Sequence, residues 1–135
     1  MNLSLVPSEL LTGVGEMDRQ HDHLFQEIQQ VKEALFSAAD DPERGLEMLS
    51  QLLVTLDAHF AWEEDAARVC GIPFFEHTKE HARIASFCRA MLGEIDSGKC
   101  NIPALMVYMD RCFEAHVFHY DLKLGQDLLA VQALE

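Results

Sequence analysis

The chain has 135 residues, and its 23 acidic against 10 basic side chains give a formal charge of −13 with neutral histidines. This length is typical of one domain with one hydrophobic core, so we expect residues 1–135 to form a single domain. The acid excess leaves little to neutralise phosphates, which argues against a nucleic-acid partner and against an anionic membrane surface. Sparse glycine and proline favour helices over a β-sandwich or barrel.

The start of the chain lacks the basic segment and the apolar run of a signal peptide, and no apolar stretch reaches membrane-spanning length. We therefore expect no membrane insertion. The cysteines lie far apart and lack CxxC spacing, which is typical of reduced, mostly buried thiols in a cytoplasmic protein. They are Cys70, Cys88, Cys100 and Cys112.

Residues 1–17 are expected to form an extended N-terminal arm, because proline and glycine disfavour helix there. Asp18 is the expected N-cap of a first helix over about 18–38. Apolar residues recur within this range at three- and four-residue steps, and His21 lies on their stripe.

A turn is expected at Asp40-Asp41-Pro42, with the aspartate as cap and the proline at the first position of a second helix. This helix runs to about Ala67, and its inward face combines leucines with His59 and Glu63. Gly71-Ile72-Pro73 then breaks the chain.

A third helix is expected over about 74–96, with His77 and His81 on its apolar stripe. Asn101 and Pro103 open a fourth helix that ends near residue 125, before a short helical tail over 125–135 packed on the outside. Long helices with short connections predict an all-α, up-down-up-down four-helix bundle over 18–124.

Every predicted helix carries metal-binding side chains on its inward stripe. Residues four apart share a helix face, which pairs His59 with Glu63 and His77 with His81. Separately hydrogen-bonded core residues would explain one buried polar side chain, but a whole set would be very costly in an apolar interior. Cations offset the carboxylates and accept the imidazole nitrogens. The sequence therefore predicts a dinuclear metal site.

The donor set limits the metal. It has no thiolate, which excludes a four-cysteine zinc site, whereas imidazole with carboxylate suits iron, manganese, zinc or copper. Two carboxylate bridges, one solvent-derived oxo or hydroxo bridge and five terminal histidines would give one six-coordinate and one five-coordinate metal. A small molecule would bind at the open position. The predicted ligands are His21, His59, Glu63, His77, His81, His116 and Asp121.

Asp121 does not follow from helical spacing. It lies five residues after His116, about 140° around a regular helix, so spacing alone pairs His116 with His119 or Tyr120. Asp121 reaches inward only if the backbone deviates near the end of the fourth helix.

These segments together resemble the hemerythrin family, specifically the single-domain bacteriohemerythrins, over about residues 13–124. The resemblance is carried by Gly15…Asp18-x-Gln20-His21, His59-Phe60-x-x-Glu63-Glu64, His77-x-x-x-His81 and His116-x-x-x-x-Asp121. All seven ligand positions of the family hold the expected residue type.

The resemblance implies two iron ions (Fe2+/Fe3+) with an oxo or hydroxo bridge, binding O2 reversibly. Glu63 and Asp121 would bridge the irons, and NO or other small anions would bind the oxidised form. One iron would take three of the histidines and the other would take two. The three are His77, His81 and His116, and the two are His21 and His59. A monomer is the expected state for such a bacterial protein.

The expected lining of the O2 pocket is Leu24, Phe60, Cys112, Phe113 and Val117. Family members often have Trp where this chain has Cys112 and Met where it has Ala67. Both changes remove volume beside the site, which would open a channel or cavity. Cys112 has two interpretations, a redox-sensitive thiol or a small buried apolar residue.

Three functions remain in competition. The first is reversible O2 binding for storage, carriage or delivery. The second is an O2-, NO- or redox-sensing module that acts through a partner protein, and the third is a di-iron enzyme. Ferritin-like di-iron oxygenases use more carboxylates, so five histidines with two carboxylates favour binding, and we expect no enzymatic activity.

Overall fold

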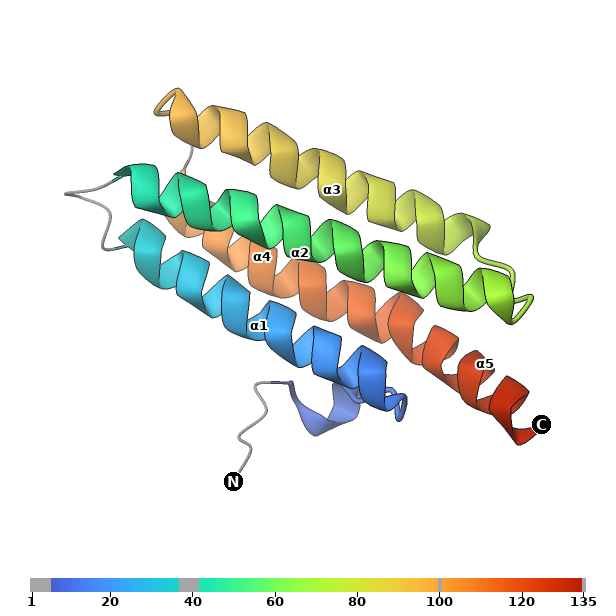
Figure 1. The fold of residues 1–135 in the computed structure, drawn as a ribbon. Coiled ribbons are helices and arrows are strands. Elements are labelled where there is room, and N and C mark those ends of the chain that lie inside the picture. The colour runs from blue at the N-terminus through green and yellow to red at the C-terminus, as the bar shows by residue number, and fades with distance from the viewer. Residues whose placement is uncertain (1–5, 37–41, 100, 135) are drawn as a thin grey trace.

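Four long helices lie side by side in the computed structural model, which describes residues 6–36, 42–99 and 101–134. Figure 1 shows successive helices running in alternate directions along the bundle. No strand occurs among the described residues, so the all-α prediction is confirmed. The elements are a 3-10 helix at Ser8–Leu10, α1 at Gly15–Phe36, α2 at Pro42–Val69, α3 at Phe75–Asp96, α4 at Ile102–His116, a π-helical turn at Val117–Asp121, and α5 at Leu122–Ala133.

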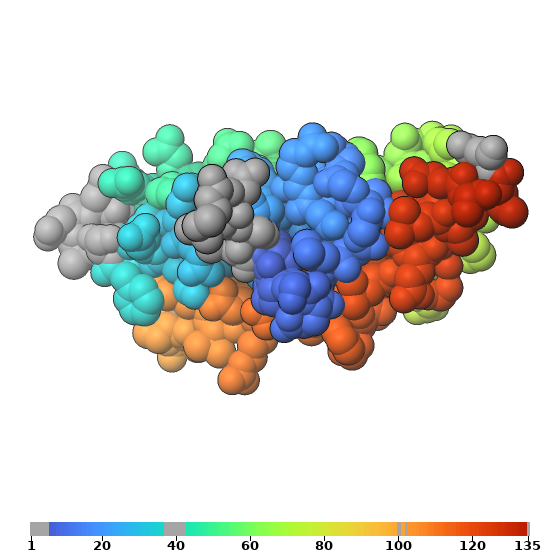
Figure 2. Space-filling view, turned by 90° about the horizontal axis from the view of Figure 1, so that it is seen from below, coloured from blue at the N-terminus to red at the C-terminus, as the bar shows by residue number. Residues whose placement is uncertain are grey.

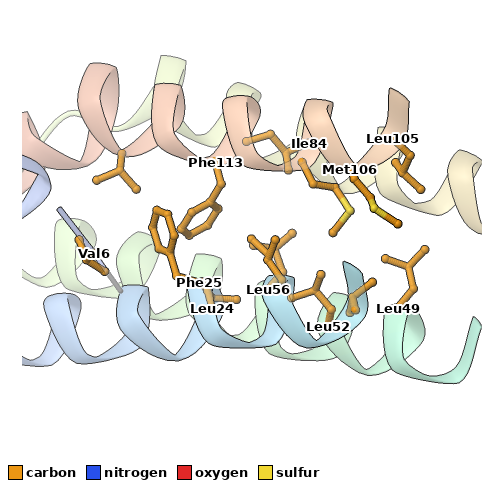
Figure 3. Packing of buried hydrophobic residues seen from close by; sticks show 14 of the residues in the cluster. Val6, Leu24, Phe25, Leu49, Leu52, Leu56, Ile84, Leu105, Met106 and Phe113 are labelled. Atoms are coloured by element: carbon orange, nitrogen blue, oxygen red, sulfur yellow. The ribbon is translucent and has the colours of Figure 1, made fainter. Parts of the chain in front are cut away.

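The core forms where the apolar stripes of the helices face one another. Figure 3 shows Leu24 of α1, Leu56 of α2, Ile84 of α3 and Phe113 of α4 within one cluster. Each of these side chains is buried. Most of the helix stability therefore comes from this shared burial rather than from intrinsic helix propensity.

The N-terminal segment differs from the expected arm. It contains a short 3-10 helix, and α1 already begins at Gly15. Asp18 is therefore not the N-cap of α1. Its carboxylate instead accepts hydrogen bonds from the N–H and hydroxyl of Thr12, at 2.8 and 2.7 Å, and from the N–H of Gly13 at 3.1 Å. These hydrogen bonds tie the preceding segment to α1.

This segment also touches the far end of the chain. A Cβ added at Gly125 would lie 2.7 Å from Thr12 Cβ, so glycine permits the close approach. Figure 2 shows the segment (dark blue) on the surface beside α1 and the fourth helix (orange to red).

The expected helix boundaries are largely confirmed. Gly71 and Gly98 end α2 and α3 with positive φ values of 67° and 74°, a conformation that glycine adopts at little cost. Asn101 caps α4, its side chain accepting a hydrogen bond from Ala104 N–H at 3.1 Å. Asp40 and its neighbour, the expected turn and cap before Pro42, lie outside the described residues.

The fourth helix continues beyond the expected end near residue 125. After α4 the chain makes a π-helical turn, in which Leu122 N–H donates to Val117 C=O, and continues as α5 to Ala133. The expected tail over 125–135 is helical to Ala133 and continues the fourth helix without a break, and its Leu128 is buried together with Leu124. They form a second apolar cluster with Met17 and Ala67.

No helix in the described parts of the chain is both long enough and apolar enough to cross a bilayer.

Candidate metal centre

Polar side chains from α1, α2, α3, α4 and the π turn meet at one site inside the bundle. Every one of these side chains is less than 8% exposed. They fall into two groups of facing ligand atoms, each group lying within 4.8 Å, and the two carboxylates belong to both groups. One group is Glu63, His77, His81, His116 and Asp121, and the other is His21, His59, Glu63 and Asp121.

Helical periodicity places most of this set. His59 and Glu63 lie one turn apart on α2, and the His59 Nε2 atom is 3.2 Å from Glu63 Oε2. His77 and His81 repeat that spacing on α3, with ring centroids 4.5 Å apart. Positions four apart on a helix face the same side, so two helices contribute two donors each.

The π turn solves the problem of Asp121. A π turn joins residues five apart, so His116 before it and Asp121 at its end point to the same side. His116 Nε2 lies 3.1 Å from Asp121 Oδ1. His116 does not share the site with His119 or Tyr120, the residues that helical spacing alone would pair with it. His119 is exposed, and Tyr120 stacks on the His116 ring.

Glu63 presents one oxygen to each half of the cluster. Its Oε1 atom lies 3.0 Å from His81 Nε2 and 3.6 Å from His77 Nε2. Its Oε2 atom lies 3.2 Å from His59 Nε2 and 3.5 Å from His21 Nε2. A carboxylate placed this way is suited to bridge two cations.

Asp121 divides its oxygens along the same line. Its Oδ1 atom lies 2.9 Å from His77 Nε2 and 3.1 Å from His116 Nε2, whereas Oδ2 lies 2.9 Å from His21 Nε2. The seven side chains thus form a three-histidine half and a two-histidine half, with both carboxylates shared.

The donor atoms are buried without hydrogen-bonding partners among the described residues. The atoms without such partners include both oxygens of Glu63, both oxygens of Asp121, and the Nε2 atoms of His21, His59 and His81. Native proteins rarely leave so many buried polar atoms unsatisfied. His77 and His116 also point their Nε2 atoms at each other at 3.3 Å. Cations between these atoms would satisfy the whole set, so the residues fit a pair of metal ions.

The charges of the cluster depend on one another. Burial acts to lower the pKa of His21, but the nearby carboxylates of Asp121 and Glu63 raise it to about 9. Burial acts in the opposite direction on Asp121, yet the surrounding imidazoles hold the pKa of its carboxyl well below its usual range. The carboxylates therefore stay ionised and attract positive charge.

Gln20 positions one histidine, a role that the sequence did not reveal. His59 Nδ1–H donates to Gln20 Oε1 at 2.7 Å, which leaves Nε2 free to face the cluster. The Gln20 amide donates in turn to Glu16 Oε1 at 2.9 Å, and this fixes its oxygen toward His59. Helical spacing cannot predict a contact between different helices.

Glu64 positions a histidine in the other half. Its Oε1 atom lies 3.2 Å from His81 Nδ1. The ring of Phe60 stacks on His81 with centroids 3.8 Å apart and planes 10° apart. Phe74 covers His77 at 4.1 Å. The imidazoles are thus held from behind by a polar partner or an aromatic face.

The expected pocket residues separate into two groups. Leu24, Cys112 and Phe113 line a cavity of about 40 Å³ beside the cluster. Phe60 does not line it and instead covers His81, and Val117 is fully buried in the π turn.

Cys112 and Ala67, the two positions where a larger residue was expected from the resemblance, lie in different surroundings. Cys112 lies at the wall of this cavity, as expected for a small residue in place of a large one. Ala67 is fully buried in the apolar cluster of α5 and does not line the cavity.

The thiols and the remaining histidines lie outside the cluster. Cys70, Cys88 and Cys112 are free and half-buried, so the expectation of mostly buried thiols is only partly met. Cys100 lies outside the described residues. His23 is exposed and pairs with Glu27 at 2.8 Å.

The comparison with protein families agrees with this geometry. The family model described as hemerythrin HHE cation binding domain matches residues 12–126. Searches of curated proteins and of solved structures found no match. Because the family model covers most of the sequence, the chain belongs to the hemerythrin family.

Proposed function

We propose that this protein holds two iron ions and binds O2 reversibly, for storage, carriage or delivery. The observation that carries the proposal is the division of the carboxylate oxygens. Oε1 of Glu63 and Oδ1 of Asp121 face the three-histidine half, whereas Oε2 and Oδ2 face the two-histidine half. If the two carboxylates are shared, the two-histidine half would supply one protein ligand fewer than the three-histidine half, and O2 would bind on that side.

When bound, the pair of ferrous ions supplies two electrons to O2 and recovers them when O2 leaves. The chain's own residues make such a cycle reversible by excluding water and protons. Phe113 closes the two-histidine side, its ring perpendicular to His21 at 6.0 Å. Phe60 seals the other side against His81. Leu24 and Val117 are completely buried and belong to the same apolar cluster as these two rings.

The set of metal ligands favours reversible O2 binding over enzymatic activation of O2. Five neutral imidazoles and two carboxylates supply less negative charge to the metals than the carboxylate-rich sets of di-iron oxygenases. Gln20, which positions His59, is also uncharged. We therefore propose a binding protein and not an enzyme.

Metal analysis combined with the visible spectrum tests this proposal. We expect two irons per chain, and an absorption band that appears when the anaerobically reduced protein meets O2 and disappears on deoxygenation. Zinc or no stoichiometric metal would overturn the proposal. Oxidation that does not reverse on deoxygenation would replace O2 binding by sensing.

Sensing through a partner protein is the second candidate, and Cys112 favours it. This half-buried thiol lies one helical turn before His116 and borders both the cavity and the outer surface of α4. If Cys112 reports oxidation, blocking it with a thiol reagent should abolish partner binding and leave the O2 spectrum unchanged.

A further inference from the structure

A small cavity lies beside the metal centre and has no role in holding the metals. Its volume is about 40 Å³, and its exposed wall is apolar. A single water needs only about 10–15 Å³, but it also needs two to four polar partners, which this wall does not offer. A larger dry cavity, of about 150 Å³ and lined by leucine, isoleucine and phenylalanine, binds xenon.

The inner wall of the cavity separates it from the two-histidine half. Leu24 and Phe113 line the cavity. Phe113 is also the ring that stands against His21 at 6.0 Å, and it packs on Phe25 at 4.9 Å. Figure 3 shows Leu24 and Phe113 on facing helices, with Leu56 and Ile84 next to them along the core. The Phe113 ring therefore lies between the cavity and His21.

The outer wall of the cavity faces a surface groove. Tyr108 and Cys112 line both the cavity and an open groove of about 480 Å³ between α3 and α4. These two side chains thus lie where the cavity and the groove meet.

Tyr108 is held in place by neighbours on α3. Its ring packs on Phe87 with centroids 4.0 Å apart, and its hydroxyl accepts a hydrogen bond from Arg83 at 3.3 Å. Arg83 is anchored in turn by Glu80, with Nε–Oε2 at 3.0 Å.

The thiol of Cys88, which also lines the cavity, behaves as an apolar group. Burial raises the pKa of the Cys88 thiol to about 11, helped by the nearby Cys112. Cys88 on α3 is therefore neutral. Cys88 and Cys112, which line the cavity from α3 and α4, are both small, and both leave space that a larger residue would fill.

We propose that this cavity is a binding site for an apolar diatomic gas, entered from the α3–α4 groove past Tyr108 and used as an antechamber for O2. Gas binding in the cavity stands on the wall residues alone. The antechamber role rests on the proposed function, because it assumes that O2 continues between Leu24 and Phe113 to the metals.

Xenon is the probe for the cavity itself. In crystals of the full chain pressurised with xenon, we expect a xenon peak enclosed by Leu24, Ile84 and Cys88. Cys88→Leu should lose the peak because the added carbons fill the space. Cys88→Ala is the matched control, since it removes the same thiol but enlarges the cavity, and it should keep the peak.

A second variant tests the cavity independently, in case Cys88→Leu does not fold. Cys112→Met fills the cavity from the facing helix and should also lose the peak, with circular dichroism and metal content confirming the fold. No peak in the wild type, or an unchanged peak in both filled variants, would overturn the gas site.

Stopped-flow O2 association tests the antechamber role. We expect Cys88→Leu to slow association roughly tenfold, which corresponds to about 1.4 kcal/mol on the barrier, and Cys88→Ala to leave it unchanged or faster. Tyr108→Ala should speed association, whereas Tyr108→Phe, which keeps the ring, should change it little. A xenon peak with unaltered association in Cys88→Leu would overturn the antechamber role. A xenon peak in a protein that shows no reversible O2 spectrum would instead refute the proposed function and leave the gas site standing.

Discussion

The two halves of the bundle interior are filled in different ways. The half that contains Leu49 and Leu105 is apolar and is built from side chains of different helices. The half that contains Glu63 and Asp121 is as deeply buried, but its polar atoms lack partners among the described residues. Apolar burial stabilises the first half directly, whereas the second half depends on cations. Stability and function are thus located in different parts of one core.

Removing a bridging carboxylate should have the largest effect. Glu63→Ala takes away one oxygen from each half of the cluster, so we expect loss of most of the metal. Metal content by elemental analysis and thermal unfolding should match those of the chelated wild type. Asp65→Ala is the control, because Asp65 is exposed and forms a surface ion pair with Arg68. Retention of two ions per chain by Glu63→Ala would contradict the bridging role.

A truncation in the apolar half should act on stability alone. Leu49 is 1% exposed, and Leu49→Ala should lower the free energy of unfolding by about 2–5 kcal/mol. The metal content should stay as in the wild type. Val54→Ala on the same helix, at a site 61% exposed, should change stability by less than about 0.5 kcal/mol. Both are measured by denaturant titration, and loss of metal from Leu49→Ala would show that the halves are coupled.

Gln20 allows a finer test within the polar half. Gln20→Leu removes the acceptor of His59 Nδ1–H, and such partners typically change metal affinity about 10–100-fold. We expect weaker binding of one ion only, because His77, His81 and His116 remain untouched. Gln26→Leu, on the exposed side of α1, is the control. Equal weakening of both steps of a metal titration would argue against separate halves.

The pH dependence of stability should distinguish the metal-free from the metal-loaded protein. In the metal-free chain the pKa of His21 is raised to about 9. Its stabilising effect is therefore complete below the ordinary pKa of about 6.5 and is lost as the pH rises through 9. The melting temperature of the chelated protein should fall from pH 6 to pH 9, and His21→Gln should abolish this fall. Metal-loaded protein, whose His21 nitrogen would bind a cation instead of a proton, should show no such fall.

The features that follow helical periodicity were predictable from the sequence. His59 with Glu63 and His77 with His81 share helix faces by spacing alone, and α3 occupies nearly the expected range. Glycine near residue 71 ends α2 as expected because few other residues adopt positive φ at low cost.

Features that depend on contacts between segments were not predictable. Asp18 was assigned as a cap, but its hydrogen bonds to Thr12 arise only after the N-terminal segment folds back onto α1. Gln20 and Glu64 meet their histidines across helix boundaries. The inward direction of Asp121 depends on a π turn. The spacing from His116 indicated that the helix must deviate, but not where or how.

The π turn is one residue longer than an α-helical path through the same space. Deleting one of the residues between His116 and Asp121 would restore the α-helix and put Asp121 four residues after His116, on the same helix face. Leu124 and Leu128 would keep their buried places, because the helix after the turn would not rotate. Descendants of this sequence can therefore lose the extra residue without losing the aspartate ligand or disrupting the core at that end of the bundle.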